Sequence, residues 1–235
     1  MIKDERPHKN SFDEILTLEK LNNQIDERIK TISQEFTDGF HFVKKCSKSI
    51  TVFGSARTLE NEEDYIKARE LGFRTAKELG YTVITGGGPG IMEAANRGAY
   101  EAGGRSFGLT IDLPMEQVTN PYLTDHMDFR YFFSRKVSMT FSAETYVYFP
   151  GGFGTLDELF EILTLVQTEK IEDIPIVLVG KKYWEDLDKY IKEHLLGGDY
   201  EKIDKSDLNL YTITDDLDEV LQIIKNAPIR LGTVT

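Results

Sequence analysis

The sequence has a single cysteine, Cys46, among its 235 residues. One cysteine cannot form an intramolecular disulfide, and without a cluster of thiols the chain has no Cys-based zinc site. The four histidines are scattered along the chain, and none has the H-E-x-x-H spacing of a zinc hydrolase. We therefore expect neither a disulfide framework nor a metal site.

Long apolar runs are also missing. No stretch approaches the roughly 20 apolar residues that a membrane-spanning helix needs. The first ten residues are charged and polar, and they lack the apolar centre of a signal peptide. Since 40% of the residues are hydrophobic, the composition predicts a globular cytoplasmic protein with no membrane partner.

Positive charge is in deficit. The chain has 28 lysines and arginines against 40 aspartates and glutamates, a net charge of −12. An acidic protein repels phosphate backbones, so we expect no nucleic-acid partner. A small anionic ligand is still compatible with this charge if one site supplies local positive potential.

The N-terminal segment has its own pattern. Residues 1–10 are predicted to be a disordered tail. Ser11 and Glu14 fit a capping box, and a recurring apolar stripe predicts a helix over residues 11–40. The stripe consists of Phe12, Ile15, Leu18, Leu21, Ile25, Ile29, Ile32 and Phe36. It must be buried, either on the main domain or on a partner subunit, and the sequence leaves both alternatives open.

Residues 41–235 alternate between strand and helix patterns. The predicted strands are Ser49–Gly54, Tyr81–Thr85, Arg105–Ile111, Thr145–Phe149 and Ile174–Val179. The predicted helices are Glu62–Leu79, Pro89–Ala102, Phe133–Phe141, Thr155–Glu169, Trp184–Leu195 and Asp215–Asn226, with residues 113–128 as a long loop. This alternation predicts an α/β fold: one Rossmann-like domain with a doubly wound parallel sheet, preceded by the N-terminal helix.

Three of the predicted strands end in loops of small residues. These loops contain Gly54 and Ser55, then Gly86, Gly87 and Gly88, then Gly151, Gly152, Phe153, Gly154 and Thr155. The carboxyl ends of parallel strands meet at one edge of the sheet, where ligands bind. Glycine lets backbone N–H groups approach a ligand, and a helix start favours an anion. The alternative is that the glycines only make tight turns, but three such loops in one sheet favour a ligand.

The loops restrict the kind of anion. None supplies the lysine of a P-loop, and the second loop fails the G-x-G-x-x-G pattern because Ile91 stands in the last place. A nucleotide triphosphatase and a standard dinucleotide site are therefore disfavoured. A single phosphate, held by loop N–H groups and the Thr155 hydroxyl, fits better.

Charged side chains near the third loop suggest chemistry. We expect Asp157 and Glu158 in the first turn of a helix, about a ribose-width from the phosphate, where a carboxylate stabilises the oxocarbenium-like state of glycosidic cleavage. The alternative is that Thr155 and Glu158 form a capping box. An arginine can bind an oxygen pair or stack on a base, but Arg135 and Lys136 also fit a solvated basic pair. A nearby aromatic group is expected in the core or an interface, with the base pocket as the alternative: Phe129, Tyr131, Phe132 and Phe133.

These motifs together resemble a known family. The signature PGGxGTxxE of the Lonely Guy (LOG) family is matched by Pro150-Gly151-Gly152-Phe153-Gly154-Thr155-Leu156-Asp157-Glu158. Arg135-Lys136 matches the upstream Arg-Lys pair of the family, and the second glycine loop matches its GGG-x-G-x-M segment. The resemblance covers residues 50–195 and leaves out the N-terminal helix.

The resemblance implies a function and roles for residues. LOG proteins are cytokinin riboside 5′-monophosphate phosphoribohydrolases, and bacterial relatives accept AMP or other nucleoside monophosphates. The family motifs imply Arg135 and Glu158 as the catalytic pair and residues 151–155 as the phosphate site. They place Lys136, Asp157 and Thr164 along the substrate. Glu116 falls in the loop where the family has another substrate contact. The resemblance implies a homo-oligomer, and it implies no metal or organic cofactor.

The sequence therefore predicts hydrolysis of the N-glycosidic bond of a purine nucleoside 5′-monophosphate, such as AMP or a cytokinin type. Proteins of this type have been labelled lysine decarboxylases, but nothing marks the Schiff-base lysine that pyridoxal phosphate would need. The alternative is a non-catalytic binding or carrier protein for a nucleotide or for molybdenum cofactor, which need not keep both Arg135 and Glu158. A structural oligomer scaffold would explain the N-terminal stripe but not the three loops.

Overall fold

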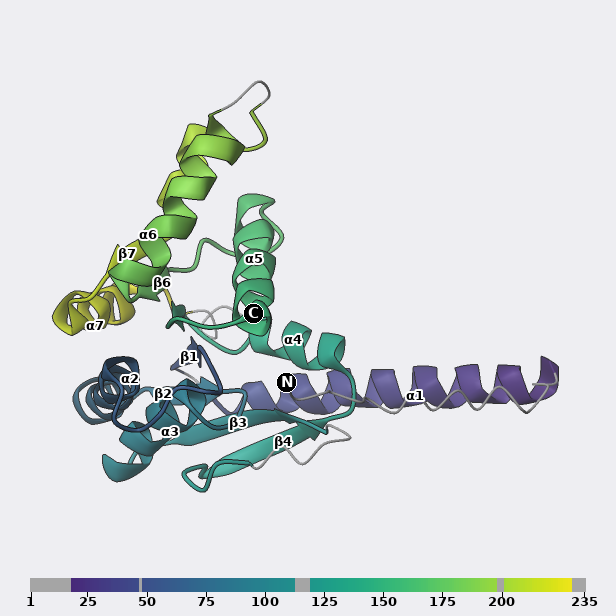
Figure 1. The fold of residues 1–235 in the computed structure, drawn as a ribbon. Coiled ribbons are helices and arrows are strands. Elements are labelled where there is room, and N and C mark those ends of the chain that lie inside the picture. The colour runs from purple at the N-terminus through teal and green to yellow at the C-terminus, as the bar shows by residue number, and fades with distance from the viewer. Residues whose placement is uncertain (1–17, 47, 113–118, 198–200, 230–235) are drawn as a thin grey trace, which may run out of the picture.

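A seven-stranded sheet runs through the described part of the chain, in the order β4-β3-β2-β1-β5-β6-β7 (Figure 1). The computed structural model describes residues 18–46, 48–112, 119–197 and 201–229. The strands are β1 Ser49–Phe53, β2 Thr82–Thr85, β3 Ser106–Ile111, β4 Asp125–Phe129, β5 Thr145–Tyr148, β6 Ile176–Val179 and β7 Thr212–Thr214. Every neighbouring pair is parallel, which confirms the predicted parallel sheet.

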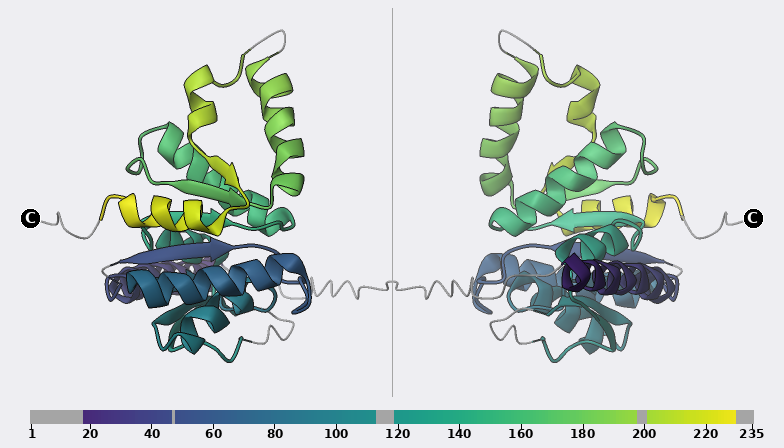
Figure 2. Two further views of the ribbon diagram at one scale, coloured as in Figure 1. Left: turned by 90° about the vertical axis from the view of Figure 1, so that its left-hand side faces the viewer. Right: turned by 90° about the vertical axis from the view of Figure 1, so that its right-hand side faces the viewer.

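Helices cover both faces of this sheet. The cores assign α1 Leu18–Val43, α4 Phe132–Thr140, α5 Phe153–Gln167 and α6 Lys181–Tyr190 to one face. They assign α2 Glu63–Arg74, α3 Ile91–Glu101 and α7 Leu217–Asn226 to the other face (Figure 2). α2 and α6 each continue as a π-helical turn, Thr75–Leu79 and Ile191–Leu196, and Lys205–Asn209 is a 3₁₀ turn. The prediction of a doubly wound α/β fold is confirmed.

The central strands are apolar on both sides because both sides are buried. In β5, Tyr146 and Tyr148 contribute to the core under α4 and α5. Val147 and the following Phe149 contribute to the core under α2 and α3. Such strands show a nearly continuous run of large residues instead of an alternation with polar ones.

The chain changes direction across the sheet between β1 and β5. From β1 it winds outward through β2, β3 and β4, and it then returns through α4 to place β5 on the other side of β1. The helices that follow β1 and β5 therefore lie on opposite faces of the sheet, and such a switch point is where open parallel sheets bind ligands.

The predicted loop over residues 113–128 is wrong at its end, because residues 125–129 form β4, parallel to β3. This edge strand is only half covered, and its sequence, Asp-His-Met-Asp-Phe, has the polar character that an exposed edge tolerates. β7, a short strand at the opposite edge, was not predicted either. The remaining boundaries differ from the predictions by a few residues.

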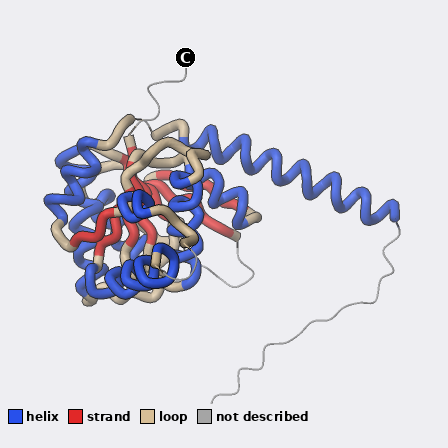
Figure 3. The backbone as a smooth tube through the Cα atoms, turned by 90° about the horizontal axis from the view of Figure 1, so that it is seen from above, coloured by secondary structure: helices blue, strands red, loops and turns tan. Residues whose placement is uncertain are grey.

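The N-terminal helix divides into two halves. α1 ends at Val43, beyond the predicted end at residue 40, and its predicted start lies in residues 1–17, outside the described residues, as does the predicted tail. Its second half packs on the domain, whereas its first half projects away from it (Figures 1 and 3). In that projecting half Leu21, Ile25 and Ile29 are 42%, 45% and 56% exposed. None of the described helices is long and apolar enough to cross a membrane.

Candidate active site

A cavity of about 610 Å³ lies at the switch point, between the loops after β1 and β5. This volume is in the usual range of small-molecule sites, about 300 to 1,000 Å³. The lining residues come from five segments that are distant in sequence. They are Phe53, Gly54, Ser55, Ala56, Arg57, Gly86, Met92, Ile111, Phe132, Arg135, Lys136, Gly152, Phe153, Gly154, Thr155, Asp157 and Glu158.

A largely buried ion pair lies in this cavity. Nη2 of Arg135, on α4, donates to Oε1 of Glu158, on α5, at 2.9 Å. The two side chains are 9% and 16% exposed. Nε of Arg135 is buried and has no hydrogen-bond partner among the described residues. Because a buried unpaired donor is costly, this atom is suited to a bound ligand or water molecule.

Burial controls the protonation of Glu158. Desolvation raises the pKa of this carboxyl to about 7, although the charge and the hydrogen bond of Arg135 lower it. The negative charge of the neighbouring Asp157 adds to the rise. A carboxyl whose pKa lies near neutral pH, in a cavity and beside an arginine, is a typical sign of a functional site.

The start of α5 decides between the two interpretations of Glu158. The helix begins at Phe153 with Gly152 as its N-cap, and no side-chain hydrogen bond caps it. Thr155 is therefore inside the first turn, and Glu158 bonds Arg135. The capping-box alternative is wrong, and so is the placement of Asp157 and Glu158 in the first turn. The first N–H groups of this helix therefore have no capping side chain as a partner.

Backbone hydrogen bonds tie the first and third loops together. The N–H of Ser55 donates to the carbonyl of Pro150 at 3.0 Å, and the N–H of Ile91 donates to the carbonyl of Ser55 at 3.0 Å. A Cβ on Gly54 would meet Ile91 at 2.7 Å, so glycine is needed for this approach. Arg57, which no sequence motif indicated, lines the cavity two residues after Ser55 and adds positive charge. A basic residue directly after a small-residue loop is the signal that could have identified it.

The second glycine loop reaches the cavity only through Gly86. A Cβ there would lie 2.9 Å from Sδ of Met92 and 3.3 Å from Nη2 of Arg135, so this glycine makes room for the guanidinium. Gly87 and Gly88 do not line the cavity. The carbonyl of Gly87 accepts from the backbone N–H of Asn120 at 2.9 Å, and that of Gly88 from its side-chain amide at 3.0 Å.

Lys136 also pairs with acidic groups of α5. Its Nζ lies 3.0 Å from Oδ2 of Asp157 and 3.2 Å from Oε2 of Glu161. Partial burial lowers the pKa of Lys136, but the hydrogen bonds to these two carboxylates outweigh burial and the net shift is upward. The ammonium group is therefore held in its charged form at the wall of the cavity.

Several predicted positions lie elsewhere. Thr164 is exposed on α5, outside the cavity lining, and its hydroxyl donates to the carbonyl of Phe160 at 2.7 Å. Gly151 does not line the cavity, and its carbonyl accepts from the Tyr183 hydroxyl at 2.6 Å. Glu116 lies outside the described residues. Of the aromatic group, Phe129 is in the core as expected, whereas Phe132 lines the cavity.

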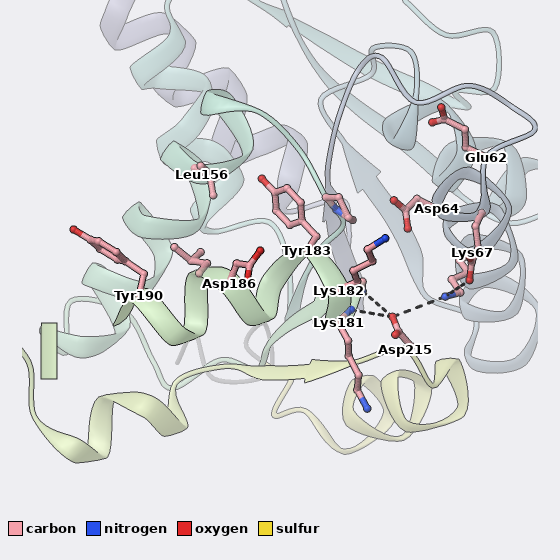
Figure 4. Close-up of a pocket in the computed structure, with 14 residues that line it drawn as sticks. Glu62, Asp64, Lys67, Leu156, Lys181, Lys182, Tyr183, Asp186, Tyr190 and Asp215 are labelled. Carbon is pink, nitrogen blue, oxygen red and sulfur yellow. Dashed lines mark hydrogen bonds and ion pairs between the residues drawn. The ribbon is translucent and has the colours of Figure 1, made fainter. Parts of the chain in front are cut away.

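A larger cavity, of about 850 Å³, lies beyond the Pro150 loop, next to the N-termini of α2 and α6 (Figure 4). Lys67 and Asp215, two of its charged residues, already have partners. Asp215 accepts from the N–H groups of Gly180 and Lys181 and lies 3.8 Å from Nζ of Lys67. The smaller cavity is the candidate site, because it contains the buried ion pair with the raised carboxyl pKa. Among the described residues, no group of His, Cys, Asp and Glu side chains is arranged to hold a metal ion.

Comparisons with known proteins agree with the motifs. A family model described as "Possible lysine decarboxylase" matches residues 92–224. The chain is 30% identical over 152 residues to a "Pyrimidine/purine nucleotide 5'-monophosphate nucleosidase" of Escherichia coli (strain K12), an alignment that covers 58% of this chain and 33% of that protein. The chain thus spans about a third of the length of this relative.

A plant relative covers more of the chain. A protein of Oryza sativa subsp. japonica named "Probable cytokinin riboside 5'-monophosphate phosphoribohydrolase LOG4" is 26% identical over 186 residues, 77% of each chain. Among solved structures, the molybdenum cofactor carrier protein of Chlamydomonas reinhardtii superposes with a TM-score of 0.55 at 25% identity, covering 76% of this chain and 96% of that one.

The ion pair makes the pKa of Glu158 testable without any substrate. Arg135→Met removes the positive charge, so the pKa of Glu158 is expected to rise above its value of about 7. Asp157→Asn removes a negative neighbour, so the same pKa is expected to fall. Carbon-13 NMR of the carboxyl group across a pH titration measures both. Shifts of the same sign in the two variants would contradict this electrostatic account.

Proposed function

We propose that this chain, which belongs to the Lonely Guy family, hydrolyses the N-glycosidic bond of a purine nucleoside 5′-monophosphate to the free base and ribose 5-phosphate. The observation that carries the proposal is the buried pair of Arg135 and Glu158, in one cavity with the open N-terminus of α5. The relatives named as nucleotide monophosphate nucleosidase and phosphoribohydrolase support it.

The phosphate of the substrate binds at the start of α5 in this proposal. The N–H groups of residues 152–155 and the positive end of the helix dipole favour an anion. Arg57, on the facing loop, adds a positive charge to the same cavity. The phosphate thus binds a protein of net charge −12 through a local positive potential.

The ribose then lies beside Glu158, one turn along α5. As the bond between the base and C1′ breaks, positive charge develops on the sugar ring and the carboxylate of Glu158 stabilises it. Water adds to C1′ and gives up a proton, for which a carboxylate with a pKa of about 7 is a suitable acceptor. The base leaves with the bonding electron pair and takes up a proton. The side chain of Asp157 is 60% exposed and pairs with Lys136, so it lacks the dry environment that a proton donor needs.

A decarboxylase that uses pyridoxal phosphate does not fit this site. The cofactor needs an uncharged lysine amine to form its Schiff base. Lys136 is the lysine that lines the cavity, and its two carboxylate partners hold it in the ammonium form by raising its pKa. The description of the family model as a decarboxylase therefore does not agree with the groups in the cavity.

A non-catalytic carrier is the competing function. The similarity in fold to a molybdenum cofactor carrier protein favours it. A protein that only binds a nucleotide or cofactor has no need for a carboxyl that is both desolvated and poised near neutral pH. Turnover and its dependence on Glu158 therefore separate the two functions.

The proposed phosphate site leads to a substrate prediction. AMP is expected to be cleaved to adenine, and adenosine is expected to react far more slowly, because the energy of phosphate binding positions the ribose. Chromatographic detection of free adenine from both compounds tests this. Equal rates for the two compounds would overturn the phosphate assignment, and no cleavage of any nucleoside monophosphate would favour a carrier.

Glu158→Gln tests the chemistry. Loss of the charge is expected to slow adenine release by about a hundredfold or more, the effect of removing one preorganised electrostatic group. AMP affinity is expected to stay near that of the wild type, because the phosphate site is untouched. Glu161→Gln, which removes the same charge from α5 outside the cavity lining, is the control and is expected to keep most of the turnover. Full activity of Glu158→Gln would refute its catalytic role.

We also propose that the chain forms a homo-oligomer through α1. The exposed stripe of Leu21, Ile25 and Ile29 lies on the half of the helix that projects from the domain. Toward the domain it is followed by Phe36 and Phe40, whose rings contact Phe133 and Phe141. The charged residues of the projecting half balance, since Asp26 and Glu27 accompany Arg28 and Lys30. A second copy of the same helix can therefore cover the stripe without charge repulsion.

Light scattering at micromolar concentration is expected to give at least twice the mass of one chain. Ile25→Asp combined with Ile29→Asp is expected to lower that mass, because both charges would be buried at the interface. Asn23→Asp, which adds a charge off the stripe of the same helix, is the control and is expected to leave the mass unchanged. A monomeric wild type would contradict the assembly.

A further inference from the structure

The helix that carries Arg135 is short and begins close to α1. α4 comprises nine residues, Phe132–Thr140, with Tyr131 as its N-cap. The first N–H groups of a helix have no partners within the helix, so the position of a short helix depends on what bonds its start. Here the N-cap residue Tyr131 and the residue before it bond a side chain of α1, a helix that lies outside the family motifs.

Glu35 of α1 is buried, with only 8% of the residue exposed, and its carboxylate bonds the start of α4. Oε1 accepts from the backbone N–H of Arg130 at 2.6 Å, and Oε2 accepts from that of Tyr131 at 3.4 Å. Oε2 also accepts from the hydroxyl of Ser134. One carboxylate therefore bonds two backbone donors and one side-chain donor, at the end of α4 where a negative charge is favourable.

Further contacts hold the two helices in register. Glu35 lies opposite Ser134, and one turn later Gly39 lies opposite Ser138, so α1 and α4 run parallel here. A Cβ on Gly39 would lie 2.3 Å from the Ser138 hydroxyl, which shows how closely the backbones approach. α4 cannot slide along α1 without breaking the bonds to Glu35.

A backbone hydrogen bond connects Arg135 to the end of α4 that Glu35 bonds. The N–H of Arg135 donates to the carbonyl of Tyr131 at 3.2 Å, and the N–H of Tyr131 reaches Glu35. Ser134, the third group bonded by Glu35, immediately precedes Arg135 in the chain. The guanidinium of Arg135 then meets Glu158 on α5. We propose that Glu35 is a positioning residue, which sets the place of α4 and thereby holds the Arg135 guanidinium against Glu158.

A substrate-free experiment tests this placement. If Glu35→Gln lets α4 shift, the guanidinium moves away and the pKa of Glu158 rises above about 7, since Arg135 lowers that pKa. Loss of the Glu35 charge alone would move the pKa in the opposite direction, so the sign is diagnostic. Asp38→Asn is the matched control. It removes a charge from an exposed position of α1 whose carboxylate bonds Gln34, and it is expected to leave the pKa of Glu158 unchanged.

The same carbon-13 titration of Glu158 decides the outcome. A pKa in Glu35→Gln equal to or below that of the wild type would overturn the proposal, whatever happens to the melting temperature. If Glu35→Gln does not fold, Ser134→Ala replaces it in the test. This substitution removes one of the three donors to Glu35 and leaves the charge of Glu35 in place. In Ser134→Ala the pKa of Glu158 is expected to rise by less than in Glu35→Gln. No rise of this pKa would overturn the proposal.

The effect on turnover rests on the proposed function. Displacement of a catalytic group by about 1 Å can slow a reaction a hundredfold, so Glu35→Gln is expected to lower kcat for AMP by about ten- to a hundredfold. The KM for AMP is expected to change little, because the start of α5 is not touched. An unchanged kcat together with an unmoved Glu158 pKa would assign Glu35 a purely structural role. A wild type that cleaves no nucleotide would refute the proposed function, while the titration would still test the placement of Arg135.

Discussion

The site depends on placing one positive and one negative charge together where water is largely excluded. Two buried charges are stable only if they meet in good geometry, because each alone would pay a large desolvation penalty. Arg135 and Glu158 come from different helices, so α4 and α5 must pack at a defined distance for the pair to form. The raised pKa of Glu158 shows that Arg135 offsets only part of that penalty. The remaining electrostatic strain is what a developing positive charge on a substrate would relieve.

Glycines near the ion pair leave room for neighbouring groups, because they have no side chain. Gly86 leaves room for the guanidinium of Arg135, and Gly54 leaves room for Ile91 at the start of α3. Gly152 starts α5 without a side chain that would occupy its first N–H groups. These three positions bring backbone, helix end and ion pair into one cavity at the switch point of the sheet. A larger side chain at Gly54 or Gly86 would push apart groups that the proposed chemistry needs side by side.

The N-terminal helix links this site to the surface of the molecule. Its second half carries Glu35, which bonds the start of α4, and its first half carries the exposed stripe. One continuous helix thus connects the proposed subunit contact with the helix of Arg135 (Figure 1). Assembly and the placement of Arg135 are expected to depend on the same element for this reason.

Local patterns in the sequence determined the five inner strands and the helices between them, the parallel sheet and the three small-residue loops. These features depend on periodicity and on glycine, and neighbouring residues are enough to show them. The pair of Glu158 and Arg135 was predicted only through the family resemblance, because the spacing of Thr155 and Glu158 by itself favoured a capping box. Only the packed structure shows that α5 starts two residues earlier and that the carboxylate meets an arginine from another helix.

The edge strand β4, the cavity position of Arg57 and the contact of Glu35 with α4 were missed for the same reason. Each depends on residues far apart in the chain, and only tertiary packing determines which of them meet.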